Sequence, residues 1–438
     1  MIGGFQNIGK IPELKRRIIF TLLMLVVYRV GCHIPIPGVD ATALAAFFNQ
    51  MQGTVLGLFN MFSGGALEQM SVMALGIMPY ITASIILQLL AIVVPHLEKL
   101  RKEGEQGRKK ITQYTRYGTV VLSIIQGLGI AYGLENMSSP DGAPVVPFGG
   151  WGFRLLTVIT LAAGTAFLMW LGEQITERGV GNGISLIIFS GIVARFFPGV
   201  GRVYELIRVG QISAFFMAIV VALMIAIVGF IVFMERAQRR IPVQYAKRVV
   251  GRKMYGGQST HLPLKINTSG VIPAIFASSM LMFPATIGNF IDLEGIPWLN
   301  YVMNTLLQGN HLVYNILYVI LIIFFCYFYT AVHFNPVDVA DNMKKQGGFI
   351  PGIRPGKNTA EYIDRVLTRI TLCGALYVSA VCVLPQIFMY QLNVPIYFGG
   401  TALLIVVGVG MDTSNQIESH MLTRHYEGFM KKGLGKVR

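Results

Sequence analysis

Apolar runs of about 20 residues recur along the whole chain, and they constrain the fold more than any other feature. A helix of that length can cross a hydrocarbon core of roughly 30 Å. We mark ten such runs, at residues 18–32, 72–94, 111–134, 153–171, 184–197, 213–234, 271–291, 313–333, 370–390 and 397–411. The sequence therefore predicts an all-α integral membrane protein with ten transmembrane helices.

Composition agrees with this prediction. Charged residues make up only 13% of the chain and hydrophobic residues 53%, whereas about a quarter of the residues of a soluble domain are charged. Basic residues precede the first run, as they do in a signal peptide. However, Arg29 interrupts the run and no small-residue cleavage site follows it. We therefore expect the first run to be a retained span.

Positive charge alternates from one connection to the next. Lys and Arg gather in the N-terminal segment, in 99–116, 236–265 and 344–369, and in the C-terminal tail. The intervening connections have few, except the fifth-to-sixth, which has Arg195, Arg202 and Arg208. Because cytoplasmic connections carry the excess of basic residues, we expect both termini in the cytoplasm. An even number of spans also places both termini on the same side of the membrane.

Two of the basic connections are too long to be simple turns. Residues 235–267 alternate apolar and basic side chains from Ile241 to Val250, which indicates a β-hairpin. Residues 334–369 suggest a helix, a Gly/Pro-rich tip and a second helix. Attraction to lipid headgroups explains the charge of these connections but not their length. We therefore favour a docking surface for a cytosolic partner.

Ten spans divide into five and five, and an odd number per half inserts the two halves in opposite senses. We expect an N-terminal half over 1–234, in which the sixth span opens the second half at about 212. A basic loop over 235–265 follows it. Spans seven to ten occupy 266–411, with the cytoplasmic loop 334–369 among them, and a cytoplasmic tail occupies 412–438.

Ionisable and potentially catalytic side chains are nearly absent from the spans. Glu173, Glu235 and Asp412 lie at span ends, and there is no catalytic triad, carboxylate pair or metal-ligand spacing. The four cysteines lie in or beside apolar runs, as buried thiols do. We expect no catalytic residue, no metal and no cofactor. This weakens two alternatives, a secondary transporter with inverted repeats and a membrane-embedded enzyme.

One stretch, from Met61 to Pro95, joins a span to a segment that is not one. Gly64 and Gly65 break the chain, and Glu68 and Gln69 follow among apolar residues. From its residues alone this segment is a re-entrant or interfacial helix. Isoleucines within the spans, such as those at positions 81 and 85, share a helix face. By spacing alone they are ordinary packing residues.

Five long stretches resemble the SecY family of protein-translocation channel subunits, and they occur in the order typical of the family. They are FNMFSGGALEQMSVMALGIMPYITASIILQLL, ITERGVGNGISLIIFSGIVA, STHLPLKINTSGVIPAIFASSMLMFPATI, GFIPGIRPGKNTAEYIDRVLTRIT and YFGGTALLIVVGVGMD. The resemblance covers nearly the whole chain. It implies two pseudo-symmetric inverted five-helix halves around an hourglass pore. The implied function is a channel, not an enzyme, which passes unfolded secretory polypeptides across the bacterial plasma membrane and releases signal sequences and membrane segments laterally.

The resemblance also assigns residues to the parts of such a channel. A short plug helix over 62–71 would include Phe62, Gly64, Gly65, Leu67, Glu68 and Met70. A pore ring would consist of Ile81, Ile85, Ile184, Ile188, Ile275 and Ile405. A lateral gate between the second and seventh spans would use Thr82, Ser84, Gln126, Asn267 and Thr268. The competing interpretation of the plug is a fixed interfacial helix with Met61, Leu67 and Met70 in lipid.

The implied partners follow from the same resemblance. They are the small SecE and SecG subunits, the SecA motor ATPase, the ribosome with its RNA phosphates, signal peptides, unfolded polypeptides and anionic lipid. The basic residues expected to meet the motor or the ribosome are Arg252, Lys253 and Arg354. Arg354 stands between two prolines in PGIRPG, which would hold it rigidly away from the body of the protein.

Overall fold

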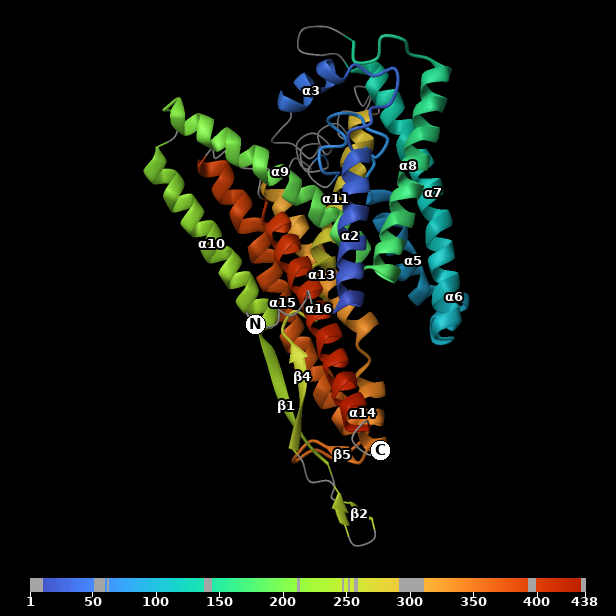
Figure 1. The fold of residues 1–438 in the computed structure, drawn as a ribbon, viewed down its shortest axis with the longest axis vertical. Coiled ribbons are helices and arrows are strands. Elements are labelled where there is room, and N and C mark those ends of the chain that lie inside the picture. The colour runs from blue at the N-terminus through green and yellow to red at the C-terminus, as the bar shows by residue number, and fades with distance from the viewer. Residues whose placement is uncertain are drawn as a thin grey trace. The chain divides into compact units, whose positions relative to one another are not determined.

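The computed structural model describes residues 11–50, 60, 63–137, 144–210, 213–245, 248–250, 253–255, 259–290, 311–392 and 399–434. These residues are mostly helical (Figure 1). They fall into two compact units, each described here by itself. The first comprises Met1–Glu205, Ser279–Tyr314 and Val409–Arg438, and the second comprises Leu206–Ser278 and Asn315–Gly408.

The first unit is built from helices that pack side by side. Helix α7 (Glu105–Asn136) lies against α8 (Trp151–Arg178), α5 (Met78–Val93) packs on α7, and α2 (Pro12–Gly31) packs on α8. The shorter α3 (Ala41–Gln50) and α6 (Pro95–Lys102) and most of α9 (Gly183–Arg208) also belong to this unit. Small residues allow the close approach, because a Cβ on Gly127 of α7 would lie 3.5 Å from the Cα of Val158 in α8.

Helices α5 and α6 meet at a bend of 98°. Pro95 opens α6, and Val94 before it has an extended backbone with ψ of 114°. Proline lacks the N–H that would continue the ladder of α5 and disfavours helical geometry in the residue before it. The helix therefore turns away just before the basic residues of the second-to-third connection.

Within the residues that the structure describes, the second unit combines helices with five strands. Its helices are α10 (Ala214–Arg236), α14 (Pro336–Lys345) and α15 (Lys357–Leu392). Its strands are β1 (Gln238–Tyr245), β2 (Arg248–Val250), β3 (Lys253–Tyr255), β4 (Ser259–Lys265) and β5 (Gly348–Phe349). Four helices run from one unit into the other: α9, α11 (Ile272–Phe290), α13 (Leu312–His333) and α16 (Gly400–Leu434).

Each of the ten apolar runs coincides with a helix, in chain order α2, α5, α7, α8, α9, α10, α11, α13, α15 and α16. Within the described residues, six helical segments are long and apolar enough to cross a membrane, and a seventh is if α5 and α6 form one bent span. The helical character predicted for the runs is confirmed. The count of ten crossings, the inverted halves and the residue ranges given for them stay predictions.

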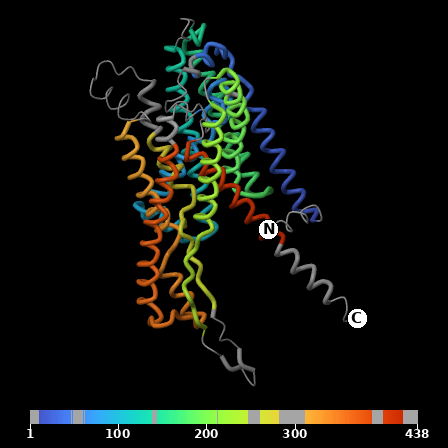
Figure 2. The backbone as a smooth tube through the Cα atoms, turned by 90° about the vertical axis from the view of Figure 1, so that its left-hand side faces the viewer, coloured from blue at the N-terminus to red at the C-terminus, as the bar shows by residue number. Residues whose placement is uncertain are grey.

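The two long basic connections fold together into one small body. Strand β1 pairs antiparallel with β4, from Gln238 opposite Lys265 to Gln244 opposite Ser259. The other edge of β1 pairs with β5, so the three-stranded sheet has the order β4-β1-β5. Figures 1 and 2 show β1 and β4 side by side, extending beyond the end of α10. The predicted hairpin is confirmed, and so is the helix, tip and helix order of 334–369.

A hydrophobic core of its own holds this body together. The buried members are Ile241, Val243, Leu264, Met343, Ile350, Ile363 and Ile370. They come from β1 and β4, from α14, from the residue after β5 and from the first half of α15. We name residues 238–265 and 334–370 the loop subdomain. Its core explains why these connections are longer than topology alone requires.

Removing part of this core should loosen both connections together. Ile363 is fully buried, so Ile363→Ala should cost about 2–5 kcal/mol of local stability. We expect amide hydrogen exchange in β1 and β4 to rise by at least tenfold, although Ile363 lies on α15. The control is Val337→Ala, which truncates an exposed residue of α14. Unchanged exchange in the strands of the Ile363 variant would contradict a shared core.

Candidate functional site

Residues 63–77 form a chain of turns and not the short helix that we predicted. Four of them have positive φ: Gly64 at 68°, Gly65 at 87°, Gly76 at 57° and Met70 at 41°. An α-helix requires negative φ throughout, and an L-residue such as Met70 adopts φ above zero only at a cost. Helix α5 consequently begins at Met78, six residues later than the start of the expected span at position 72.

A two-stranded contact fixes the C-terminal end of this segment. Pro35 and Ser71 form an antiparallel bridge. The N–H of Ile36 donates to the carbonyl of Met70 at 2.9 Å, and the N–H of Val72 donates to the carbonyl of Ile34, also at 2.9 Å. The chain that leaves α2 thus supplies hydrogen bonds that a helix would have made within itself.

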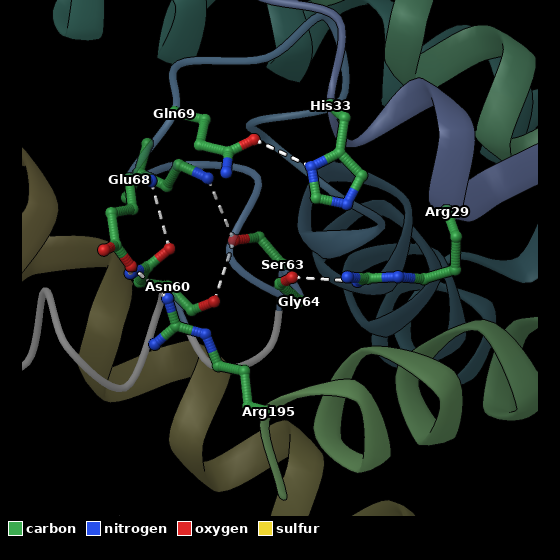
Figure 3. A network of polar contacts seen from close by, with 9 residues as sticks. Arg29, His33, Asn60, Ser63, Gly64, Glu68, Gln69 and Arg195 are labelled. Atoms are coloured by element: carbon green, nitrogen blue, oxygen red, sulfur yellow. Dashed lines mark hydrogen bonds and ion pairs between the residues drawn. The ribbon is translucent and has the colours of Figure 1, made fainter. Parts of the chain in front are cut away.

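Glu68 lies at the centre of a polar network (Figure 3). Its carboxylate pairs with the guanidinium of Arg195 from α9 and accepts a hydrogen bond from Asn60 Nδ2 at 3.0 Å. The side-chain oxygen of Asn60 accepts the N–H of Glu68 in return, at 3.1 Å. Nearby, His33 Nδ1 and Gln69 Oε1 are 3.0 Å apart. Side chains from three regions of the first unit therefore hold residues 68 and 69.

The glycine end of the segment is held against α2 and α9. Arg29 Nη1 donates to the carbonyl of Gly64 at 2.9 Å, and the buried hydroxyl of Tyr28 donates to the carbonyl of Ser63 at 3.2 Å. A Cβ on Gly64 would lie 2.9 Å from the Cα of Gly191 in α9. Positive φ and this close approach together require glycine at position 64.

Most of the segment is buried in protein. Ala66 and Met70 have no exposed surface, and Leu67 is 6% exposed. An interfacial helix with Leu67 and Met70 in lipid is not what the structure shows. Phe62, the first residue of the expected plug, lies outside the described residues.

The six isoleucines of the expected pore ring avoid the outer surface. Ile184 is half-buried and the other five are buried. They lie on four helices: Ile81 and Ile85 on α5, Ile184 and Ile188 on α9, Ile275 on α11 and Ile405 on α16. The last two belong to the second unit and the first four to the first unit. Their convergence on one ring stays a prediction.

The residues assigned to the lateral gate are Thr82, Ser84, Gln126, Asn267 and Thr268. All but Gln126 make hydrogen bonds close to them in sequence or within their own unit. The hydroxyls of Thr82 and Thr268 donate to backbone carbonyls four and three residues earlier, and Ser84 accepts from the side chain of Gln88. Asn267 Nδ2 donates to Glu235 Oε1 at 2.6 Å. The buried Oε1 of Gln126 has no hydrogen-bond partner among the described residues. The gate itself stays a prediction.

The residues assigned to docking lie in the loop subdomain or its hairpin tip. Arg354 is exposed in the turn between β5 and α15. Its carbonyl accepts the hydroxyl of Thr359, and Gly352 and Gly356 on either side have positive φ. Lys253 begins β3 opposite Val250, while Arg252 lies outside the described residues.

Sequence reasoning missed the partners of the buried segment. Arg29 was noted only as an interruption of an apolar run, and Arg195 only as an exception to the charge pattern. Both are arginines in or beside a predicted span, where an ionisable side chain needs a polar partner. That signal pointed to some contact, but the partners lie 35 residues away for Arg29 and 127 residues away for Arg195.

The Glu68–Arg195 pair should hold the buried segment in place. Glu68→Gln keeps the size of the side chain but removes the ion pair. Residues 63–77 should therefore detach from α2 and α9 more often. We expect amide hydrogen exchange in residues 63–77 to rise several-fold. The double charge swap Glu68→Arg with Arg195→Glu should restore the wild-type exchange rate in part. Wild-type exchange in the Glu68→Gln variant would show that the pair does not hold the segment.

Comparison with known proteins identifies the family. The SecY family model matches residues 71–414. Protein translocase subunit SecY of Pseudomonas aeruginosa is 55% identical over 427 residues, which is 97% of this chain and 95% of that protein. The same subunit of Escherichia coli is 54% identical over 425 residues, again 97% and 95% of the two chains.

Solved structures share the fold. A protein-conducting channel superposes with a TM-score of 0.67 at 17% identity. A SecY structure described by the role of its plug domain in stabilising the closed channel also gives 0.67, at 19% identity. Sec61 from a canine ribosome-channel complex gives 0.61 at 15% identity. Each alignment covers 94% of this chain and 93% of the other. This chain is therefore a member of the SecY family, a multi-pass membrane subunit of a bacterial protein-conducting channel and not an enzyme.

Proposed function

We propose that residues 62–71 are a movable plug that seals the channel when it is idle. The observation that carries the proposal is how the segment is held. Its turns are fixed by side chains of α2 and α9 and by the contact with residues 34–36, and not by a continuous helical ladder. Such a segment can break these contacts and move away without unwinding α5. Deleting 62–71 should therefore favour opening while leaving translocation possible.

The six isoleucines form the pore ring in this proposal. The burial of five of them supports an inward-facing position, and β-branched side chains are stiff at χ1. A ring of them makes an apolar constriction that excludes water and fits loosely around an extended polypeptide of any sequence. The ring and the plug would close the same path, so neither has to seal it alone.

Polar substitution of the ring should make the idle channel leak. Replacing Ile81, Ile85 and Ile188 together with Ser should wet the constriction and raise resting ion conductance several-fold. Ile86→Ser is the control, because Ile86 stands next to Ile85 on α5 but is 44% exposed. Equal conductance in the triple variant and in the control would remove the pore ring from these positions.

The lateral gate of the proposal opens between α5 and α11, which are the second and seventh expected spans. Thr82, Ser84, Gln126, Asn267 and Thr268 would face it. Hydrogen bonds between membrane helices average only about 0.6 kcal/mol, so a signal sequence can displace them. SecE and SecG would assemble around the chain in the plasma membrane, with both termini in the cytoplasm.

The loop subdomain is the docking platform in this proposal. It has its own core, and it presents Arg354 in a turn bounded by prolines and glycines. The SecA motor and the ribosome are the proposed partners, and the canine structural neighbour comes from a ribosome-channel complex. Contact of Arg252, Lys253 and Arg354 with ribosomal RNA phosphates would weaken as the salt concentration rises.

Reversing the charge of Arg354 should uncouple the motor without damaging the fold. The side chain is exposed, so Arg354→Glu should accumulate normally in the membrane but lose SecA-driven translocation in reconstituted vesicles. Arg208→Glu is the matched control, because Arg208 is exposed at the end of α9, which we expect on the opposite side of the membrane. Normal transport by the Arg354 variant, or failure of that variant to accumulate, would contradict the proposal.

A further inference from the structure

The turn between α8 and α9, residues 179–183, is held by side chains from other helices. The N–H of Val180 donates to the hydroxyl oxygen of Thr21 in α2 at 3.0 Å. The N–H of Gly181 donates to Oε1 of Gln416 in α16 at 2.9 Å. The partners lie 159 and 235 residues away in the chain, and all of these residues belong to the first unit. Two helices distant in sequence therefore fix two adjacent peptide groups of the turn.

Gly181 brings the turn close to α16. Its φ is 88°, which favours glycine, and a Cβ there would lie 3.1 Å from the hydroxyl oxygen of Thr413. Thr413 and Gln416 are three residues apart, so they are neighbours on one face of α16. That face therefore rests against the turn, and Gln416 supplies its hydrogen bond.

The turn leads directly into two residues that we assigned to the pore ring. Helix α9 begins at Gly183, whose N–H donates to the hydroxyl oxygen of Thr176 in α8 at 2.9 Å. The next residue, Ile184, packs on α8, because a Cβ on Gly172 would lie 3.2 Å from its side chain. Ile188 lies about one helical turn later and is buried. A shift of the turn would thus move both isoleucines.

Gln416 lies just beyond the apolar run of α16. This run ends at Met411, and the helix continues to Leu434 through mostly polar residues. We name residues 412–434 the α16 extension and place it in the cytoplasm. Because a continuous helix moves as a rigid element over a few turns, movement of the extension would reach the turn at 179–183 through Gln416.

We propose that Gln416 is a positioning residue for the pore ring, which ties the α16 extension to the first turn of α9. Its side-chain oxygen holds the N–H of Gly181, and the turn fixes Ile184 and Ile188. Displacement of the extension therefore loosens the seal. The proposal rests on the pore ring of the proposed function, and it adds to that function a residue outside the ring that controls how firmly the ring closes.

The first experiment compares three variants of the full channel complex in vesicles. Gln416→Leu removes the acceptor at similar size, so hydrogen exchange in 180–188 should rise about fivefold and resting ion conductance about twofold, as loss of one hydrogen bond predicts. Gln416→Glu retains an acceptor oxygen and should behave as wild type in both measurements. Asn415→Leu is the matched control, because Asn415 is exposed on a different face of the helix. Unchanged exchange in 405–412 verifies that α16 remains folded.

A second pair of variants tests the link to the α16 extension. His420→Pro interrupts the helix one turn after Gln416, because proline removes the N–H that bonds to the carbonyl four residues earlier. His420→Ala retains the helix and is the control. We expect only the proline variant to raise exchange in 180–188. In the Gln416→Leu background it should add nothing, because both changes act through the same contact.

Four outcomes would overturn the proposal. Wild-type exchange in Gln416→Leu would mean that this hydrogen bond does not hold the turn. Equal changes in Gln416→Leu and Gln416→Glu would mean that packing acts there and not the acceptor oxygen. The extension would not act through Gln416 if His420→Pro had no effect, or if its effect persisted in the Gln416→Leu background.

The conductance measurement separates this proposal from the pore ring itself. If the triple Ser variant of the ring leaks but Gln416→Leu does not, the turn does not position the ring, which is the fourth outcome. If neither variant leaks while exchange in 180–188 still responds to Gln416→Leu, the turn is held as described and the pore ring of the proposed function is wrong.

Discussion

Hydrocarbon offers no hydrogen-bond partner to a peptide group, so each N–H and C=O within the membrane must find one inside the protein. The apolar helices meet this requirement through their own backbone ladders. Residues 63–77 do not, because their positive φ values interrupt any ladder. Arg29, Tyr28 and the chain at 34–36 supply the missing partners, and burial separates the turns from lipid. Irregular backbone is tolerated here because other parts of the first unit enclose it.

The same arrangement bears on how firmly the segment is held. The side chains of Glu68 and Arg195 are 27% and 34% exposed, and partly solvated ion pairs contribute only about 1 kcal/mol or less. The hydrogen bonds that Arg29 and Tyr28 donate to backbone carbonyls contribute about 1–3 kcal/mol each. Together with the burial of Ala66, Leu67 and Met70, these contacts give the segment a defined position in the first unit.

A second consequence concerns the basic connections. Their charge is explained by topology, since positive residues stay in the cytoplasm, but their length is explained by packing. Ile241 and Val243 of β1 are buried with Ile363 of α15, more than 100 residues later in the chain. The two basic connections, Arg354 among them, are thus parts of one body. Force applied to the loop subdomain would be transmitted directly to α10 and α15, which continue from it.

The sequence by itself determined the local elements. Apolar runs, the alternation after Ile241 and the Gly/Pro tip at 351–356 each became the predicted helix, strand or turn, because periodicity and turn residues report local hydrogen bonding and burial. Only the tertiary structure decided that Glu68 pairs with Arg195, that β1 pairs with β5 and that residues 63–77 are not helical. These features depend on partners far apart in sequence, which a local pattern cannot identify. Gly64 shows the limit most clearly: its freedom to bend is visible in the sequence, but the closeness of Gly191 that requires a glycine there is not.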